Sequence, residues 1–461
     1  MQPLNPDLIV RGATVTHRGT TSVCDLWVRG GRVERLEPSI SLPPGASPRG
    51  ASPREIDAAG LWLLPGVIDS HVHFRDPGFP AKGSMHSESR AAVAGGVTTV
   101  FDMPNTLPPT MDVESWTDKM RRARQRMWTN YAFYAGVHAE RWQDALAIDP
   151  TQIPGYTDDG LYMEERDVLL CNRPEVLERV LLEVPKLLAL HCEDEVHIQA
   201  QLLEAQREFG TELPVRLHSQ IRDEHACVAA TQRVLEVLRA VPRPVHVLHV
   251  STAREVQLIR AAAAEGLPAT AELCVHHATF SQGDYGRLGA AIRWNPSVKS
   301  STDRDYLRQA AAKGWMATLA TDHAPHRWSE KGGPYHCGCS GAPSVQHLLV
   351  QALEWVHSGE WTLPQLVQLT SHGVAEHFGL RERGFLDPGC FADFVLVDPN
   401  GGTEVRPDTS YYACGWSPWE RKRFRSRVVA TFVNGCEAFN ADQRVWAPKA
   451  PGQSCLFNPT S

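Results

Sequence analysis

Residues 66–78 read GVIDSHVHFRDPG, an apolar run that stops at two histidines, His71 and His73. Histidines at positions i and i+2 of a β-strand point to the same face, so both imidazoles can reach one metal ion. This pattern alone is a weak signal, because two solvent-facing histidines on a strand produce it too. Its meaning depends on whether other strands of the chain end in the same way.

Further apolar runs of the chain also stop at polar groups. They are TTVFDMPN (98–105), LLALHCED (187–194), VHVLHVST (245–252), TAELCVHH (270–277) and WMATLATDHAPH (315–326), with GYTDDG (155–160) weaker as a strand. Helical patterns follow several of them, such as PEVLERVLLEV (174–184). This alternation predicts βα units and a parallel sheet. Polar groups at successive strand ends converge on the C-terminal mouth of a (β/α)₈ barrel.

The two ends of the chain show a different pattern, with short bursts of alternating apolar and polar residues. Examples are DLIVRG (7–12), DLWVRGGRVERL (25–36), FADFVLVDP (391–399) and VVATFVNGCEAF (428–439). Such bursts are typical of short antiparallel strands. We therefore expect an α/β protein: a distorted (β/α)₈ TIM barrel over 65–385, and a small β-sandwich domain built from 1–64 and 386–461.

Composition narrows the function classes. The 461 residues are 42% hydrophobic and carry a formal net charge of −7, which gives no reason to expect nucleic acid or an anionic membrane as partner. The first residues, MQPLNPDLIVRG, lack the pattern of a signal peptide, and no run of 18 apolar residues occurs. The 11 scattered cysteines are then best interpreted as reduced thiols of a cytoplasmic protein.

A metal site is the hypothesis that best explains the polar strand ends. His191 or His249 alone would more often be an ordinary buried histidine than a ligand. Four histidines at three strand ends, with Asp322 at a further one, are hard to attribute to chance. Neutral imidazole together with a carboxylate is a set that Zn²⁺ prefers, and we expect one or two zinc ions, with two favoured.

Six motifs, in this order along nearly the whole chain, resemble the dihydroorotase branch of the metal-dependent amidohydrolases. They are HVHFRDPG (71–78), DMPNT (102–106), HCED (191–194), HVST (249–252), WNP (294–296) and TDHAPH (321–326). The resemblance implies a metal site and a substrate site. The metal-site residues that it implies are His71, His73, His191, His249 and Asp322, and the substrate-binding residues are His73, Arg75, Asn105, Asn295 and His326, with the backbone around Gly341.

Elementary chemistry is consistent with these roles. Arg75 lies two residues after His73, so it faces the same mouth, where a guanidinium can bind a carboxylate with two hydrogen bonds. Asn105 can donate to the same carboxylate from the next strand. Asp322 is the candidate general acid/base, which takes a proton from the attacking water and passes it to the leaving ring nitrogen. The alternatives are a surface ion pair for Arg75 and a plain ligand or loop cap for Asp322.

The group that bridges two metals is the open point. Many members of the superfamily use a carboxylated lysine, but no lysine lies between Lys119 and Lys186. The segment GYTDDG is similar to the TDDG of one dihydroorotase class, which implies Asp159 as the bridge, with Asp158 as the fallback. An Asp-Gly pair also favours a simple turn. Other stretches, such as AGGVTTVFDMPNTLPPT (94–110), are more similar to a lysine-using subgroup.

The segment KGGPYHCGCSG (331–341) is a Gly/Cys-rich loop after the strand that carries Asp322. It fits a flexible lid, a further metal site through His336, Cys337 and Cys339, or a mobile loop with incidental thiols. The cysteine spacing does not match that of structural zinc sites, which disfavours the second interpretation.

The resemblance implies a dihydroorotase that reversibly hydrolyses (S)-dihydroorotate to N-carbamoyl-L-aspartate in pyrimidine biosynthesis. Two rivals remain: an allantoinase or dihydropyrimidinase, and a silent subunit that only scaffolds a partner. The expected partners are a small substrate that carries a carboxylate, a second copy of the chain in a homo-oligomer, and aspartate transcarbamoylase.

Overall fold

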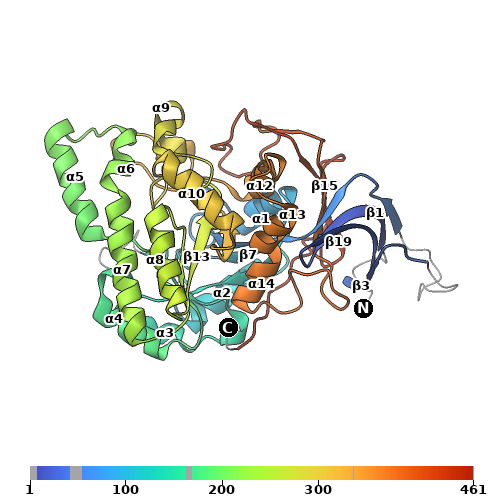
Figure 1. The fold of residues 1–461 in the computed structure, drawn as a ribbon, viewed down its shortest axis with the longest axis horizontal. Coiled ribbons are helices and arrows are strands. Elements are labelled where there is room, and N and C mark those ends of the chain that lie inside the picture. Colours follow the sequence, from blue (N-terminus) through green and yellow to red (C-terminus); the bar gives the residue numbers. More distant parts are fainter. Residues whose placement is uncertain (1–7, 42–53, 162–168, 336, 460–461) are drawn as a thin grey trace.

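The computed structural model describes residues 8–41, 54–161, 169–335 and 337–459. A barrel wrapped in helices makes up most of the molecule, and a β-sheet lies at one end of it (Figure 1). Within the described residues no helix is both long and apolar enough to cross a membrane.

Eight parallel strand positions form the barrel, as predicted. They are β6 (Val67–Val72), β7 (Val97–Asp102), β8 (Asn130–Phe133) continued by β9 (Ala135–Gly136), β10 (Tyr156–Thr157), β11 (Leu188–Leu190), β12 (Val245–Val247), β13 (Ala269–Cys274) and β14 (Thr318–Ala320). Neighbours pair in parallel, and a bridge between Val72 and His323 closes the ring beside β6. The barrel is distorted, because the third position is interrupted at Tyr134 and β10 has only two residues.

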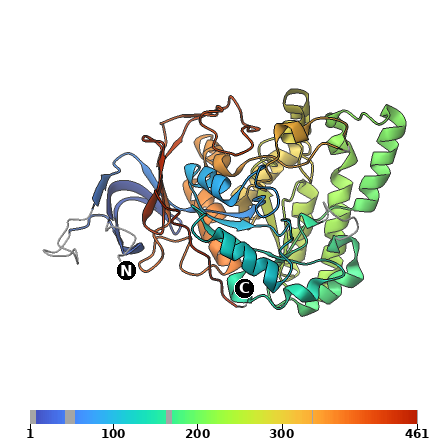
Figure 2. The same ribbon diagram turned by 180° about the vertical axis from the view of Figure 1, so that it is seen from behind.

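Helices surround this ring. The α-helices are α1 (Met85–Ala94), α2 (Val113–Ala123), α3 (Trp142–Ala145), α4 (Pro174–Glu183), α5 (Glu195–Phe209), α6 (His218–Ile221), α7 (Glu224–Ala240), α8 (Ala253–Ala264), α9 (Tyr285–Leu288), α10 (Ser301–Ala312), α11 (Trp328–Lys331), α12 (Leu348–His357), α13 (Leu363–Val367) and α14 (Gly373–Phe378). Helices α7, α8 and α10 cover one side of the barrel in Figure 1, and α2 covers the opposite side, which Figure 2 shows. Short single-turn elements are η1 (Pro150–Gln152), η3 (Leu170–Asn172), η4 (Val215–Leu217), η5 (Gln282–Asp284), η6 (Gly289–Ile292), η7 (Val345–His347) and the π-helix η8 (Gln368–His372).

Local sequence explains where chain direction changes at the mouth. Thr252, shortly after β12, accepts from the Glu255 backbone N–H while the Glu255 side chain accepts from the Thr252 N–H. This capping box starts α8 directly after the strand end that carries His249.

Strands β6 and β7 are buried along their whole length, as strands of a parallel sheet covered on both faces are. Polar groups at the ends of such strands are therefore held on a rigid frame.

The two chain ends pair, as predicted, into a separate β-domain. Its strands form a nine-stranded sheet: β1 (Leu8–His17), β2 (Thr20–Arg29), β3 (Arg32–Glu37), β4 (Arg54–Asp57), β5 (Trp62–Pro65), β15 (Phe394–Asp398), β18 (Arg427–Val433), β19 (Cys436–Asn440) and β20 (Val445–Trp446). Antiparallel pairing of β5 with β15 joins the N-terminal half to the C-terminal half. A small ladder of β16 (Thr403–Glu404) and β17 (Arg423–Phe424) lies apart from this sheet.

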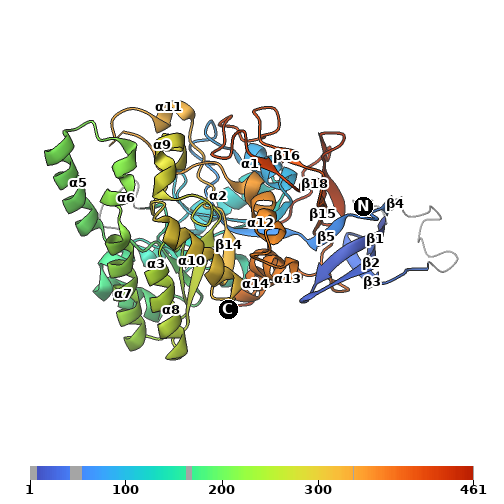
Figure 3. The ribbon, with the colours of Figure 1, turned by 45° about the horizontal axis from the view of Figure 1, so that its top comes forward.

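The C-terminal tail leaves this sheet and returns to the barrel. Tyr131 of β8 donates its N–H to the Gln453 carbonyl over 3.0 Å and accepts from the Cys455 N–H over 2.9 Å. The tail ends beneath α14, where the Asn458 N–H donates to the Gly379 carbonyl (Figures 1 and 3). The exact domain boundaries at 64/65 and 385/386 stay a prediction.

Candidate metal centre and active site

The histidines of β6 meet Asp322 at the mouth of the barrel. His71 Nε2 and His73 Nε2 lie 3.2 Å apart. Asp322 follows β14, and its Oδ1 lies 3.0 Å from His73 Nε2 and 3.6 Å from His71 Nε2. Three ligand-type atoms from two neighbouring barrel strands therefore face one point.

A second pair of imidazoles lies beside the first. His191 follows β11 and His249 follows β12, and their ring centroids are 4.6 Å apart. Asp159, just after β10, lies between the two pairs. Its Oδ2 is 3.3 Å from the Nε2 atoms of both His71 and His73. Its Oδ1 is 3.2 Å from His191 Nδ1 and 3.5 Å from His249 Nε2. One carboxylate thus touches both pairs, which is the geometry of a bridge.

These residues fit a divalent metal. All six of these groups are at most 5% exposed. Among the described side chains, Asp159 Oδ2 and both ring nitrogens of His249 have no hydrogen-bond partner, although they are buried. Buried polar atoms are normally satisfied, so such orphans call for a ligand. Imidazole nitrogens and carboxylate oxygens are the donors that zinc binds.

Three of the histidines are oriented by acceptors on their far sides. His71 Nδ1 lies 2.7 Å from Glu272 Oε1, and His191 Nε2 lies 2.8 Å from Glu193 Oε2. His73 Nδ1 lies 2.8 Å from Asn105 Oδ1. Because each acceptor requires a hydrogen on that ring nitrogen, the lone pair of the other nitrogen is left to face the cluster. This is how metal-binding histidines are usually held.

Glu272 and Glu193 were not among the residues singled out from the sequence. Glu272 also accepts the His249 backbone N–H over 3.1 Å, so it touches both halves of the cluster. Burial alone would raise the pKa of the Glu272 carboxyl, but His71, His246 and His249 bring that pKa to about 2. The sequence did hold a signal, because a glutamate inside the apolar run TAELC needs a buried partner.

Asp158, the alternative bridge, points elsewhere. Its carboxylate accepts the backbone N–H groups of Leu170 over 2.9 Å and His191 over 3.1 Å. Burial raises the pKa of this carboxyl to about 7. The geometry therefore favours Asp159 over Asp158 at the bridging position.

The backbone is unusual at two cluster residues. His249 has φ of 36° and Asp322 has φ of 45°. Residues other than glycine seldom adopt this left-handed conformation, which costs of order 1–3 kcal/mol and is found mainly at functional sites. Trp294 contributes to holding Asp322, because its indole N–H donates to the Asp322 carbonyl over 3.4 Å.

A pocket opens beside the cluster, and several predicted substrate-binding residues line it. The lining residues are His73, Arg75, Asn105, Asp159, Gly160, Trp294, Asn295, Asp322, Ala324, Ser340 and Gly341. Asn295 Oδ1 is buried and has no partner among the described residues, so it can accept from a ligand N–H. Since the Asn105 amide oxygen accepts from His73, its NH₂ group is the part available to a ligand.

Two glycines make room for this pocket. A Cβ on Gly160 would lie 2.5 Å from Asn105 Cγ, and Gly160 has φ of +75°. A Cβ on Gly341, which has φ of +111°, would lie 2.7 Å from the carbonyl oxygen of Ala324. A side chain at either position would displace the pocket wall.

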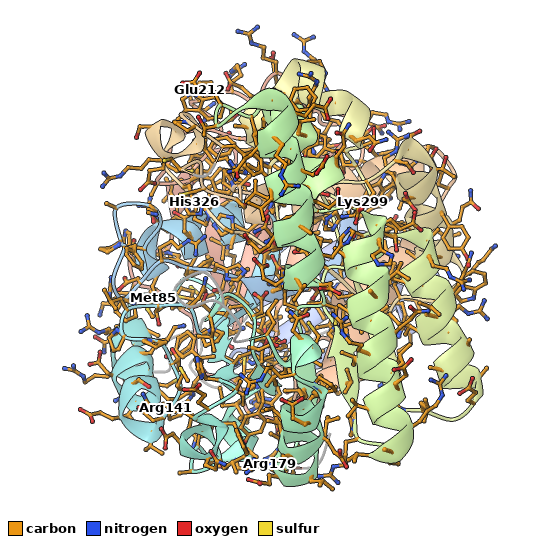
Figure 4. The ribbon with its side chains drawn as sticks, turned by 90° about the vertical axis from the view of Figure 1, so that its left-hand side faces the viewer. Met85, Arg141, Arg179, Glu212, Lys299 and His326 are labelled. Carbon is orange, nitrogen blue, oxygen red and sulfur yellow. The ribbon has the colours of Figure 1, made fainter. Side chains whose placement is uncertain are left out.

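Arg75 brings a positive charge to the pocket. It is 6% exposed and forms no ion pair with any described residue. Its Nη2 lies 3.2 Å from His326 Nε2, and its Nε donates to the Pro325 carbonyl over 3.3 Å. His326 is not among the lining residues, but it borders the pocket, because its Cδ2 would lie 3.4 Å from a Cβ on Gly341. In Figure 4 the labelled His326 lies in the upper part of the molecule, with Arg141 and Arg179 in the lower part.

The Gly/Cys-rich loop 331–341 is anchored at both of its described parts. Lys331 Nζ donates to the carbonyls of Arg293, Cys339 and Gly341 over 3.1, 3.0 and 2.6 Å. Tyr335 Oη lies 2.6 Å from His218 Nδ1. His336 lies outside the described residues, so the further metal site stays untested. Ser340 and Gly341, at the end of the loop, line the pocket.

A (β/α)₈ barrel with histidines and carboxylates gathered at its mouth defines the class of metal-dependent hydrolases. The model of the family described as "Amidohydrolase family" matches residues 62–437, and the chain belongs to this family. The chain is 30% identical over 429 residues to a dihydroorotase of Methanosarcina acetivorans, covering 90% of this chain and 88% of that protein.

Other relatives carry other activities in their names. The chain is 31% identical over 461 residues to an allantoinase of Rubrobacter xylanophilus, covering 96% of each. Among solved structures, the L-hydantoinase (dihydropyrimidinase) of Arthrobacter aurescens superposes with a TM-score of 0.88 at 24% identity, covering 98% of this chain and all of that one. These matches confirm the fold and the resemblance, and they leave the ring that is hydrolysed open.

Proposed function

We propose that this hydrolase is a zinc-dependent dihydroorotase that interconverts (S)-dihydroorotate and N-carbamoyl-L-aspartate. The observation that carries this proposal is Arg75, a buried cation with no ion pair among the described residues, which lines the same pocket as the metal cluster. A buried, unpaired charge is costly, and a substrate carboxylate would neutralise it. Dihydroorotate carries such a carboxylate, whereas allantoin and dihydrouracil are neutral rings.

The ligand set that we assign is His71, His73 and Asp322 on one side and His191 and His249 on the other, with Asp159 between them. A bound zinc ion would polarise the scissile carbonyl and lower the pKa of water. Glu272, Glu193 and Asn105 hold the ligand imidazoles in the orientation that this binding needs.

The remaining chemistry falls to side chains of the pocket. Asp322 accepts a proton from the attacking water and delivers it to the leaving ring nitrogen, and the same transfers run backwards when the ring closes. Arg75, the Asn105 amide and His326 bind the carboxylate. Asn295 accepts a ring N–H, and the main chain at Gly341 completes the wall.

An allantoinase is the second candidate, because the relative of that name covers nearly the whole chain. The experiment that separates the two is a turnover assay of the zinc-loaded protein with dihydroorotate, allantoin and dihydrouracil side by side. We expect kcat/KM for dihydroorotate to exceed that for either neutral ring by about 100-fold, the scale of a lost charged contact. Higher kcat/KM for allantoin would overturn the proposal.

A silent scaffold is disfavoured, because all six residues that we assign as ligands are present and are linked by side-chain contacts of 3.6 Å or less. Protein that binds zinc and turns over none of the three rings would restore that alternative. The cytoplasmic location, the homo-oligomer and the association with aspartate transcarbamoylase stay predictions.

A further inference from the structure

We propose that Lys82 is a positioning residue that sets which nitrogen of His326 carries its hydrogen, so that His326 donates to the substrate carboxylate. The inference rests on the proposed function, because it assumes that an anion binds beside Arg75. It adds a residue outside the pocket wall to those that determine the preference for a charged substrate.

Four side chains lie in a row from the pocket outwards. Arg75 Nη2 is 3.2 Å from His326 Nε2, and on the other side of the ring Lys82 Nζ is 3.3 Å from His326 Nδ1. Lys82 Nζ is also 3.2 Å from Glu330 Oε1. Glu330, whose side chain is 30% exposed, ends this row of contacts and does not line the pocket. The imidazole is thus flanked by two cations.

The hydrogens carried by each group limit which hydrogen bonds can form at the same time. A guanidinium and an ammonium can only donate, and a neutral imidazole has one nitrogen that accepts and one that donates. Burial lowers the pKa of His326 well below its usual value, helped by the positive charges of Arg75, Lys331 and Lys82 and opposed by the polar backbone of Ser340, so the ring is neutral. Arg75 and Lys82 therefore compete for a single lone pair.

A carboxylate would resolve this competition. Arg75 could then donate to the carboxylate and would no longer need the lone pair of His326 as an acceptor. With Lys82 donating to Nδ1, the hydrogen is on Nε2, the nitrogen that faces Arg75. His326 and Arg75 would then both donate to the same anion.

The backbone holds the row in place. Arg75 donates its N–H to the Gly83 carbonyl over 2.9 Å, which ties the Lys82 turn to the arginine. The His326 carbonyl accepts from the Trp416 indole N–H over 2.8 Å. The Arg327 backbone N–H donates to Glu330 Oε2 over 2.8 Å, so the Glu330 side chain caps this turn. Lys82 is thus held more firmly than a free surface lysine.

The alternative is that Lys82 merely forms an ion pair at the rim with Glu330. Partly exposed pairs of this kind contribute little, and removal of the lysine would then change binding by a factor of about five or less. The two explanations predict different results when His326 itself is changed.

The test measures binding to zinc-loaded protein by calorimetry. The probes are orotate, an unsaturated ring that carries the carboxylate, and uracil, the same ring without it. We expect Lys82→Met to weaken orotate binding by about tenfold or more, the value of one charge-assisted hydrogen bond, and to leave uracil binding unchanged. Lys449→Met, which removes an exposed lysine, is the matched control and should leave both unchanged.

Substitution of His326 separates positioning from simple charge. In His326→Gln the amide nitrogen takes the place of Nε2 and can donate without help from Lys82. We expect Lys82→Met to weaken orotate binding less than threefold in that background, about the scale of a partly exposed charge contact. An equal loss in both backgrounds, or an equal loss for uracil, would overturn the inference.

The proposed function can fail separately. If the unsubstituted protein binds orotate no better than uracil, the pocket does not select a carboxylate and the dihydroorotase assignment falls. If that preference is present and Lys82→Met preserves it, only the role of Lys82 is refuted.

Discussion

The metal cluster and the anion pocket share one wall at the barrel mouth but differ in how their charges are balanced. In the cluster, Asp159 and Asp322 lie among four histidines, whose lone pairs converge. At the pocket, Arg75 supplies donors from the wall, His326 and Lys82 continue the row of contacts beyond it, and Glu330 ends that row. The cluster is therefore built for a cation and the pocket for an anion. Variants should change metal binding or charge preference according to the region that they alter.

The largest effect is expected at the bridge. Asp159→Ala removes the one carboxylate that touches both imidazole pairs, so we expect loss of about half or more of the bound zinc and turnover at background. Metal content by atomic emission, with turnover on the same sample, checks this. The matched control is Asp158→Asn, which should keep its zinc because Asp158 binds backbone N–H groups. The opposite pattern would place Asp158 at the bridge.

The next effect is expected at the proton shuttle. Asp322→Asn keeps the shape of the side chain but removes its basicity, and we expect kcat to fall by about 10²- to 10⁴-fold. Since Asn can still offer an oxygen, the variant should retain more zinc than Asp159→Ala. A kcat within a factor of about five of the unsubstituted value, far below the loss expected of a missing general base, would show that another group moves the proton.

The cluster was more predictable from sequence than the pocket, for a physical reason. Strand periodicity and strand ends are local features, so His71, His73, His191, His249 and Asp322 could be predicted to converge. The choice between Asp158 and Asp159 could not be made locally, because adjacent residues in an irregular turn face opposite ways. Lys82 contacts His326, which is 244 positions away in the chain, and Glu272 contacts His71, which is 201 positions away. No local pattern in the sequence encodes either contact.

The terminal sheet shows the same limit. Alternating strands at both ends predicted that they would pair, and β5 with β15 does so. The return of the tail to β8 was not predictable, because residues 451–458 carry no strand-like alternation and are held by scattered backbone hydrogen bonds, two of them at Tyr131.

A substitution in the pocket should reduce the preference for a charged substrate without loss of metal. Arg75→Met removes a buried cation that a carboxylate would pair with, an effect of about 2 to 5 kcal/mol, or roughly 30-fold or more in kcat/KM for dihydroorotate. Turnover of a neutral ring should change little, and zinc content should not change. Arg207→Met, on the exposed face of α5, controls for net charge. Equal losses for charged and neutral rings would place Arg75 outside substrate recognition.

The smallest effect on turnover is expected at Glu272, which touches both halves of the cluster but does not line the pocket. Glu272→Gln keeps an oxygen for the His71 Nδ1 hydrogen but loses the charge that strengthens this bond, so zinc affinity should fall by about 10- to 100-fold. Competition with a chelator of known affinity measures this, and saturating zinc should restore most of the turnover. The preference for orotate over uracil should stay unchanged, since Glu272 lies on the far side of His71 from the pocket. If that preference changed with zinc saturated, the cluster and the pocket would be one coupled site, and the division between cation and anion regions would be wrong.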